Sequence, residues 1–487
     1  MSPRVGEALR RTFAAARTSR NFRLYLVGQV VSAAGTWMNF TASSWLVLQL
    51  SGSGTAIGIN AALAFGPVLV LAPWSGAIAD RHDRRRILTV TQAALGLIAL
   101  ATFTLIITGA ANLTLVYALS LAGGVVTAFD NPTRQSFYVE MVGERALANA
   151  VSLNSAAFTG ARIVGPAVAG LLISTVGIAW PFLVDGLSYL AVIAALLAMR
   201  PEEMHPQARS TERGRRLLEG LRYVWSTPGL RRPLVVLAVV FTVSFQFMVL
   251  IPLLTERVFH EGAEVFGSLS AVAGLGSFVG ALVMAHRNAR PSLAELGGLA
   301  VAFGVGLLFV AVAPSLPVAV ALMVPLGFVT MGFMITGNTM LQLNARPDAR
   351  GRVMALYGAV FLGSTPIGSL AIGWFAEHVG VRAGFALAGV VACLTGLVVV
   401  GGAPASSGAR LRRDRSVGAT SQTAPGGRPG AAGAGPTARR RAPTEGTAGP
   451  SRRRSERIRG EGGAPGRVGA GTGRPGGWPP SRGGEPP

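Results

Sequence analysis

The sequence predicts an all-α polytopic membrane protein with twelve transmembrane helices, arranged as two pseudo-symmetric six-helix bundles. Of its 487 residues 50% are hydrophobic and 14% are charged, and long apolar runs recur between residues 24 and 402. Soluble domains carry about 25% charged residues. A helix that crosses a membrane needs roughly 20 predominantly apolar residues, which is about the length of these runs. The bilayer is therefore the expected solvent for most of the chain.

Twelve apolar runs follow one another as six, a polar break, and six more. They cover residues 24–49, 56–79, 87–108, 113–130, 150–173, 179–199, 233–254, 265–285, 295–313, 317–338, 353–375 and 382–402. We therefore expect an N-terminal bundle at 22–199 and a C-terminal bundle at 233–402. The break, residues 200–232, predicts a cytoplasmic linker, and its stretch 213–226 predicts an amphipathic helix on the membrane surface.

Arginine marks alternate connectors between these runs. The basic N-terminus 1–21, the linker and the connectors after the even-numbered runs hold nearly all of it, whereas the other connectors hold only Arg257 and Arg382. Basic loops stay on the cytoplasmic side of a membrane. The alternation predicts an even number of spans, both termini in the cytoplasm and a plasma-membrane location. The first run is not followed by an obvious cleavage site, so we expect it to be a retained span.

The composition also bears on the possible activities. The net charge of +22 is reached without a single lysine. A phosphate loop ending in Lys-Ser or Lys-Thr is therefore ruled out, which argues against a nucleotide-driven pump. The lone Cys393 has no partner for a disulfide or a thiolate cluster, and the five histidines are scattered. We expect no enzyme activity, no metal and no cofactor.

From residue 403 the chain becomes rich in Gly, Pro, Ala, Ser and Arg, with sixteen arginines against five acidic residues. Such a segment has almost nothing to bury, which predicts a disordered cytoplasmic tail at 403–487. Its charge suits attraction to anionic inner-leaflet lipids or to nucleic acid. A solvated tail without a specific partner is the alternative that we favour.

The two halves echo each other in sequence. Residues 144–153 lead into Gly165-Pro166, and residues 348–356 lead into Thr365-Pro366, each joining an arginine-bearing loop to a proline-containing span. Duplicated six-span units are common in secondary transporters, with the substrate site between the repeats. Coincidence among low-complexity apolar residues is the alternative.

The connector between the second and third runs reads Gly76-Ala-Ile-Ala-Asp80-Arg81-His-Asp-Arg84-Arg85-Arg86. It resembles the loop signature of the major facilitator superfamily. A glycine at the helix end permits close helix approach, and a carboxylate at the membrane edge favours pairing. The resemblance implies that Asp80 meets the start of the eleventh span, near 352–355, when the cytoplasmic side is shut, so the motif forms a gate. A static topology anchor is the alternative.

In the fifth run, Gly160-Ala-Arg162-Ile-Val-Gly165-Pro166-Ala-Val-Ala-Gly170 is similar to the Gly-Pro motif of the superfamily's antiporters. Small residues allow tight packing, and a proline frees a carbonyl and bends the helix. Ala161 and Ala169 stand where the family often has glycine. Packing alone is the alternative reason for this composition.

Charged and polar residues within the runs are candidates for the transport pathway or for coupling. A charge within a span costs at least ~2.5 kcal/mol, so Arg162 should face a cavity or a partner. Asp185 in the sixth run lies at a similar depth, and we expect the two to pair or relay, with separate partners as the alternative. Further candidates from the runs are Asp130, Asn39, Gln246 and Asn338.

The segment Phe129-Asp-Asn-Pro-Thr-Arg-Gln135, expected as a loop, resembles the siderophore-exporter and macrolide-efflux branch of the superfamily. The resemblance spans residues 20–402 and implies a monomeric, proton-coupled exporter of small amphipathic molecules that works by alternating access. The fourth span lacks the embedded arginine of many drug antiporters, which leaves Asp185, Asp130 or Asp80 to handle protons. An uptake permease of the same fold, or a non-transporting protein that recruits partners through its tail, are the alternatives.

Overall fold

The computed structural model describes residues 14–205, 214–287, 291–346 and 349–401. Within these ranges the chain is helical apart from short connectors, and no strand occurs. The predicted tail 403–487 and most of the predicted N-terminal segment lie outside the described residues. The side chain of Asp80 is also outside them, although its backbone belongs to a helix.

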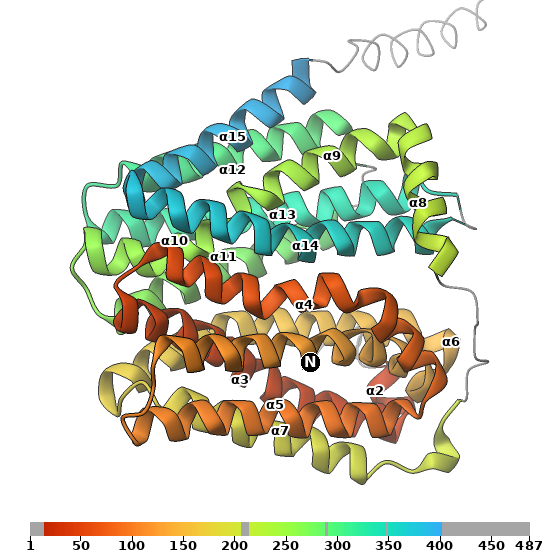
Figure 1. Cartoon of the computed structure of the whole chain (residues 1–487). Coiled ribbons are helices and arrows are strands. Elements are labelled where there is room, and N and C mark those ends of the chain that lie inside the picture. Colours follow the sequence, from red (N-terminus) through yellow and green to blue (C-terminus); the bar gives the residue numbers. More distant parts are fainter. Residues whose placement is uncertain (1–13, 206–213, 288–290, 347–348, 402–487) are drawn as a thin grey trace, which may run out of the picture. The chain divides into compact units, whose positions relative to one another are not determined.

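The helices follow the predicted order of the runs (Figure 1). The first half contains α2 (Ala14–Thr18), α3 (Arg20–Ser51), α4 (Gly54–Arg81), α5 (Arg84–Ile107), α6 (Leu113–Thr175) and α7 (Trp180–Leu197). A short 3₁₀ turn, η1 (Pro201–Glu203), and the linker helix α8 (Gly214–Ser226) lead into the second half. That half contains α9 (Pro228–Thr242), η2 (Ser244–Gln246), α10 (Phe247–Leu253), η3 (Leu254–Val258), α11 (Ala263–His286), α12 (Leu293–Ala311), α13 (Leu316–Asn344), α14 (Arg350–His378) and α15 (Val381–Gly401).

Ten helical segments of the described chain are long and apolar enough to cross a membrane. One of them, α6, has 63 residues and contains two spans joined at Gly143, whose φ of 69° and ψ of 171° break the helix. Helix α3 has 32 residues but is less apolar, and it supplies the remaining span. The protein is thus a twelve-span, multi-pass membrane protein, as predicted.

The connection between the fourth and fifth spans differs from the prediction. Residues 131–142 were expected to form part of a loop, yet α6 continues through Pro132 up to the break at Gly143. Phe137, Tyr138 and Met141 share a helix face and are buried, and Tyr138 meets Phe22 edge to face with ring centroids 6.5 Å apart. This buried face stabilises the helix beyond the apolar run, since packing of an amphipathic face provides most helical stability.

The seventh span is interrupted where one continuous run was expected. Helix α9 ends at Thr242, and the chain passes through the 3₁₀ turn η2 into α10 and then into the π-helical turn η3. The Gln246 side-chain amide donates to the carbonyl of Phe241 at 2.8 Å, so it satisfies a backbone group released by the break. Breaks of this kind are tolerated in membranes only where side chains or neighbouring helices restore the lost hydrogen bonds.

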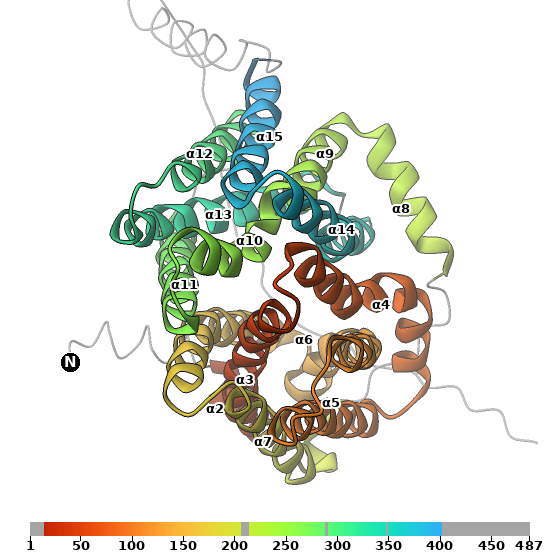
Figure 2. The ribbon, with the colours of Figure 1, turned by 60° about the vertical axis from the view of Figure 1, so that its left-hand side comes forward.

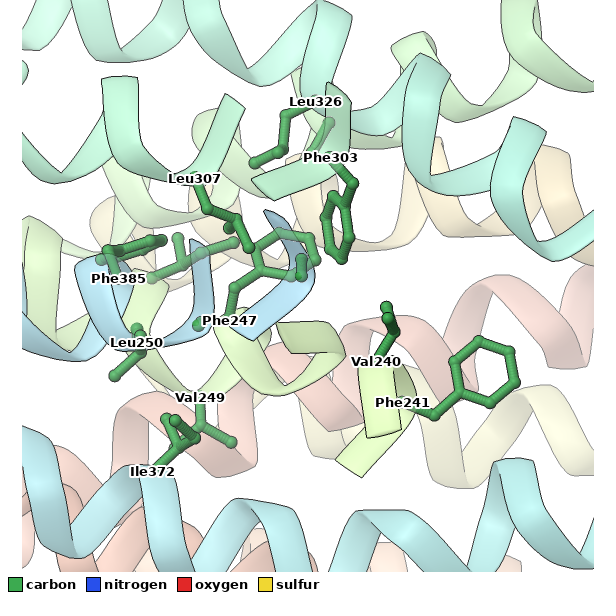
Figure 3. Packing of buried hydrophobic residues seen from close by; sticks show 14 of the residues in the cluster. Val240, Phe241, Phe247, Val249, Leu250, Phe303, Leu307, Leu326, Ile372 and Phe385 are labelled. Carbon is green, nitrogen blue, oxygen red and sulfur yellow. The ribbon is translucent and has the colours of Figure 1, made fainter. Parts of the chain in front are cut away.

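Buried aromatic and aliphatic side chains form the core of the second half. Figure 3 shows Phe247 of α10 close to Phe303 of α12, and their ring centroids lie 5.9 Å apart. Phe385 of α15 and Leu326 of α13 belong to the same buried cluster. The short helix α10 is therefore held from several sides despite the breaks at both of its ends.

The two halves meet along two helix pairs, α4 with α14 and α6 with α11 (Figure 2). Glycines allow close packing along both helix pairs, which are called the seams below. A Cβ at Gly58 would lie 2.4 Å from the carbonyl oxygen of Ser369, and one at Gly267 would lie 2.6 Å from that of Pro166. Small residues allow such close backbone approach in membranes, where no hydrophobic drive holds helices together.

Candidate transport pathway and gates

An ion pair of the second half bonds to the backbone of the first half at one end of the helices, here called the short-connector end, where the connectors 52–53, 259–262 and 379–380 lie. Arg257 of η3 bonds the carboxylate of Glu377 on α14 at 3.1 Å. Glu377 also accepts the backbone N–H of Gly54 on α4 at 2.5 Å, and Arg257 donates to the carbonyl of Gly52. The cluster closes this end, because each side chain of the second half is bonded to backbone of the first.

Two arginines of the basic motif between α4 and α5 bond to other helices. Arg84 is 9% exposed and forms an ion pair with Glu140 of α6. Arg85 donates to the carbonyls of Leu196 and Leu197 at the end of α7, at 2.7 and 3.0 Å. Cations at a helix C-terminus satisfy its free carbonyls and its dipole. Arg84 and Arg85 therefore bind the start of α5 to two other helices of the same half.

The arginines at the two ends of that motif, Arg81 and Arg86, form no such contacts with other helices among the described residues. Arg81 is exposed, and Arg86 is exposed beside Asp83, with a nitrogen to oxygen distance of 3.9 Å. The close helix approach predicted at Gly76 is not seen in this structure, because no atom of the described residues lies within 4 Å of a Cβ built there. The predicted contact of Asp80 concerns a side chain outside the described residues.

The start of α14, the expected partner of the gate, is occupied by the linker helix. Arg352 lies 3.7 Å from the carboxylate of Glu219 on α8, and a Cβ at Gly220 would lie 3.1 Å from the Cβ of Arg352. The stretch 213–226 therefore does form a helix from residue 214, and it packs on α14.

The Gly-Pro motif on α6 serves packing at two of its three glycines. A Cβ at Gly165 would lie 2.5 Å from the Cβ of Trp37 on α3, and one at Gly170 would lie 2.9 Å from the carbonyl oxygen of Ala263 on α11. Around Gly160 no atom lies within 4 Å of such a Cβ, so tight packing was wrongly expected at that position. The motif joins α6 both to its own half and to the other half.

The predicted pair of Arg162 and Asp185 is not formed. Asp185 is 1% exposed and accepts the side-chain amide of Asn39 at 2.8 Å. The Arg162 guanidinium instead lies over the ring of Trp37, 5.3 Å from its centroid. The spacing of residues along the two helices predicted similar depths of Arg162 and Asp185 in the membrane. The helices, however, point these two side chains toward different neighbours. The alternative prediction, that each has its own partner, therefore describes this structure.

Asp130 is the centre of a satisfied polar cluster between α5 and α6. One oxygen accepts Thr91 at 2.8 Å and Gln92 at 2.7 Å, and the other accepts Arg134 Nε at 3.0 Å. Its side chain is 3% exposed. Both oxygens are therefore bonded, one of them to a guanidinium one turn away on the same helix.

The remaining polar candidates have local partners. Gln246 is 4% exposed, and its side chain bonds to the Phe241 carbonyl at the break in the seventh span. Asn338 accepts the side-chain amide of Gln342 at 2.5 Å on the same helix. Neither is brought next to Arg162 or Asp185 by a contact within the described residues.

Sequence reasoning missed two charged groups, Glu377 and Glu140. For Glu377 a signal was present, because its partner Arg257 is one of the two arginines that depart from the alternating charge pattern. An arginine in a connector of the set that otherwise lacks arginine indicates a specific carboxylate partner. Glu140 lay in the stretch expected to be a loop, where its position opposite Arg84 had no signal.

Comparison with known proteins agrees with this architecture. Residues 11–406 match the family described as transmembrane secretion effector. The chain belongs to this family of the major facilitator superfamily. It is 30% identical over 391 residues to the multidrug efflux pump Tap of Mycolicibacterium fortuitum, covering 77% of this chain and 94% of that protein.

Two other relatives are more distant. The staphyloferrin A transporter of Staphylococcus aureus is 24% identical, with 74% of this chain and 91% of that protein covered. The enterobactin exporter EntS of Shigella boydii is also 24% identical, with 73% and 85% covered. The matched family and these relatives are all transporters.

Solved structures share the fold. The nucleoside transporter NupG superposes with a TM-score of 0.63 at 9% identity, covering 78% of this chain and 98% of that one. A bacterial homologue of the human lysosomal transporter Spinster superposes with a TM-score of 0.58 at 16% identity, covering 78% and 95%. At these identities the likeness establishes the fold of two six-helix halves.

Proposed function

We propose that the protein is a secondary active exporter of small amphipathic molecules that works by alternating access. The observation that carries the proposal is the charged cluster of Arg257 and Glu377, whose side chains bond to the backbone of the first half at one end of two glycine-packed seams. Rocking about the seams would break this cluster, the hydrogen bond from Ser369 to the Gly58 carbonyl and the close glycine contacts, which is the kind of bistable interface that alternating access requires. The relatives that export drugs and siderophores support the direction of transport and the substrate type.

The proposed orientation places both termini in the cytoplasm and the short-connector end outside, in a plasma membrane. It rests on the arginine-rich connectors at the opposite end. In this orientation the structure is closed toward the outside. The protein works as a monomer in this proposal, since each chain contains both halves of the pathway.

Protons are the proposed coupling ion, and Asp185 is the strongest candidate carrier. Its Oδ2 receives Asn39, while its buried Oδ1 has no hydrogen-bond partner among the described residues. An unpartnered buried carboxylate oxygen is costly when charged and gains from a proton. Asp130, with both oxygens bonded, is the weaker candidate, and Asp80 is the proposed gate.

An accumulation assay tests the function. Cells that express the protein should accumulate less of an amphipathic dye than cells without it, and a protonophore should abolish the difference. Higher accumulation on expression would favour the uptake permease. A chain truncated after Gly402 should retain export; loss of export together with a surviving tail-dependent complex would favour the recruiting protein.

The gate has its own test. Asp80→Asn should lower export while the protein still inserts in the membrane, because the neutral amide cannot form a charge pair when the cytoplasmic side shuts. Unchanged export rates in this variant would remove Asp80 from the gate.

A further inference from the structure

Arg162 lies in a small cavity on the seam between the halves. About 20 Å of helix separate it from Thr175 at the short-connector end of α6, which places it deep in the membrane. The first half lines the cavity with Trp37, Phe40, Thr41, Arg162 and Pro166, and the second half lines it with Met248, Phe266, Ser270, Ala273 and Gly274. A Cβ at Gly274 would lie 3.0 Å from the Arg162 carbonyl oxygen, so the seam passes directly beside this residue.

No acidic side chain of the described chain pairs with Arg162. Its guanidinium rests on the Trp37 ring, 5.3 Å from the centroid. A cation on an indole face gains less free energy than a charge loses on leaving water. The cation is thus oriented by Trp37 but not neutralised.

Two polar groups of this cavity, on Trp37 and Arg162, are donors without an acceptor among the described residues, whereas the Ser270 hydroxyl, which also lines the cavity, can both donate and accept. The indole Nε1 of Trp37 is buried and has no hydrogen-bond partner among the described residues. Indole and guanidinium groups can only donate. Thr41, the neighbouring hydroxyl, already donates to the carbonyl of Trp37 at 3.0 Å. Two donor-only groups without an acceptor, one of them charged, call for a negatively charged oxygen.

The shape of the cavity limits what it can hold. It has about 10 Å³ of free space, close to the minimum for one water molecule. Its other walls are the apolar or aromatic side chains of Phe40, Phe266 and Met248. In this conformation the cavity has room for no more than a water-sized group, so a larger head group would enter only when the seam widens, with the body of its molecule outside the cavity.

We propose that Arg162 and Trp37 bind a single anionic head group, a carboxylate or a group of similar size, on the transported molecule. This inference rests on the proposed export function and names the substrate class as amphipathic monoanions. Because both halves line the cavity, rocking at the α6–α11 seam changes its width and hence its affinity for the head group. The site is thereby coupled to the conformational cycle.

A matched pair of probes tests this assignment. A BODIPY-propionic acid and its methyl ester share their apolar body and differ in the anionic group. Binding to the purified full-length protein is measured by fluorescence polarisation, and export by reconstitution in proteoliposomes. The variants are Arg162→Gln, Arg162→Lys and Trp37→Phe, with Arg287→Gln as control, because Arg287 is a partly exposed arginine paired with Glu295 away from the cavity.

The wild type should bind the acid about tenfold more tightly than the ester, as expected for hydrogen bonds to a charged group. Arg162→Gln should remove the preference by weakening acid binding alone, Arg162→Lys should keep part of it, and Arg287→Gln should keep all of it. Trp37→Phe retains the aromatic face but lacks the N–H, so it should weaken acid binding about threefold. If Arg162→Gln fails to fold, Arg162→Lys and Trp37→Phe carry the test.

Two results would overturn the inference. One is a wild type that binds the acid no better than the ester. The other is an Arg162→Gln variant that keeps the wild-type ratio. If the wild type exports the ester and ignores the charge, the anion site fails while the export function stands. If proteoliposomes and cells export no amphipathic probe at all, the export function itself fails.

Discussion

Glu377 on α14 accepts the backbone N–H of Gly54 on α4 at 2.5 Å, so a carboxylate of the second half is bonded to the main chain of the first. Arg257 binds the same carboxylate and neutralises it. The side chains of Arg257 and Glu377 are 32% and 28% exposed. A partly exposed ion pair of this kind is strong enough to favour one transporter conformation over the other. It is also weak enough to be broken in each transport cycle.

Glu377→Gln should open the short-connector end. The neutral amide accepts more weakly from Gly54 and no longer holds Arg257 beside the Gly52 carbonyl, a change of about 1 kcal/mol, or roughly fivefold in the conformational equilibrium. Spin labels at V176C and V379C, in a C393S background, should show a larger population of long distances. Both positions are exposed.

Glu295→Gln is the matched control for this experiment, since its ion pair with Arg287 joins two residues of the second half without a bond to the first. It should leave the distance distribution of the labels unchanged. A distribution in Glu377→Gln equal to that of the wild type would mean that the Glu377 carboxylate does not hold the halves together.

Gly267→Ala should force α6 and α11 apart where the two halves meet. The added Cβ would lie 2.6 Å from the Pro166 carbonyl oxygen and 2.8 Å from Gly170 Cα, both backbone atoms that cannot rotate away. Overpacking of this kind costs about 1–3 kcal/mol. Export should fall severalfold while the protein still inserts. Gly298→Ala, where no atom lies within 4 Å, should export normally, and equal export by both variants would contradict the seam's role.

Arg84→Ala and Arg86→Ala should differ sharply although both remove one arginine from one motif. Arg84 is buried against Glu140, and its loss leaves that carboxylate without its cation, which costs about 2 kcal/mol. Arg86 is 88% exposed, so its loss should change stability little. Thermal unfolding in detergent measures both, and equal shifts would show that the motif acts only through its net charge.

Asn39→Ala should destabilise the protein through Asp185. It removes the amide that bonds the buried carboxylate and should cost about 1–3 kcal/mol. Asp185→Asn in the same background removes the charge and should recover part of the loss in thermal unfolding. No recovery would mean that Asn39 acts by packing alone.

Arg162→Ala and Asp185→Ala should give additive transport defects. The two side chains have different partners, Trp37 and Asn39, and independent sites add in free energy. Export rates of the two single variants and the double variant give the coupling between them. A double variant that exports better than Arg162→Ala would revive the pair that the sequence predicted.

The number and order of the spans could be predicted because hydrophobic length is a property of the sequence alone. Packing of Gly165 and Gly170 was also predictable, since small residues in a span usually face another helix. The pairing of Arg162 with Asp185 was not, because helical rise gives depth in the membrane but not the direction of a side chain. In a helix that is apolar on all sides, the sequence carries no clear signal of rotation.

The end of the fourth span shows a second limit. Polar residues after Asp130 and the following Pro132 are typical of a loop, yet the helix continues to Gly143. Its stability there depends on contacts of Phe137 and Tyr138 with Phe22 and Tyr25 of α3, more than a hundred residues earlier. Such long-range contacts produce no periodic hydrophobic pattern in the local sequence that is stronger than the helix-ending signal of a proline.

The contact of Glu377 with the first half has a consequence for how this transporter can vary. Its partners there are the N–H of Gly54 and, through Arg257, the carbonyl of Gly52, both of them main-chain groups. Neither glycine can be exchanged freely, because Gly52 has a φ of 61° and a Cβ at Gly54 would lie 2.8 Å from Leu253 Cδ1 and 3.0 Å from the carbonyl oxygen of Gly373. Variation that changes the strength of this contact without straining the backbone is therefore expected at positions 257 and 377, both in the second half.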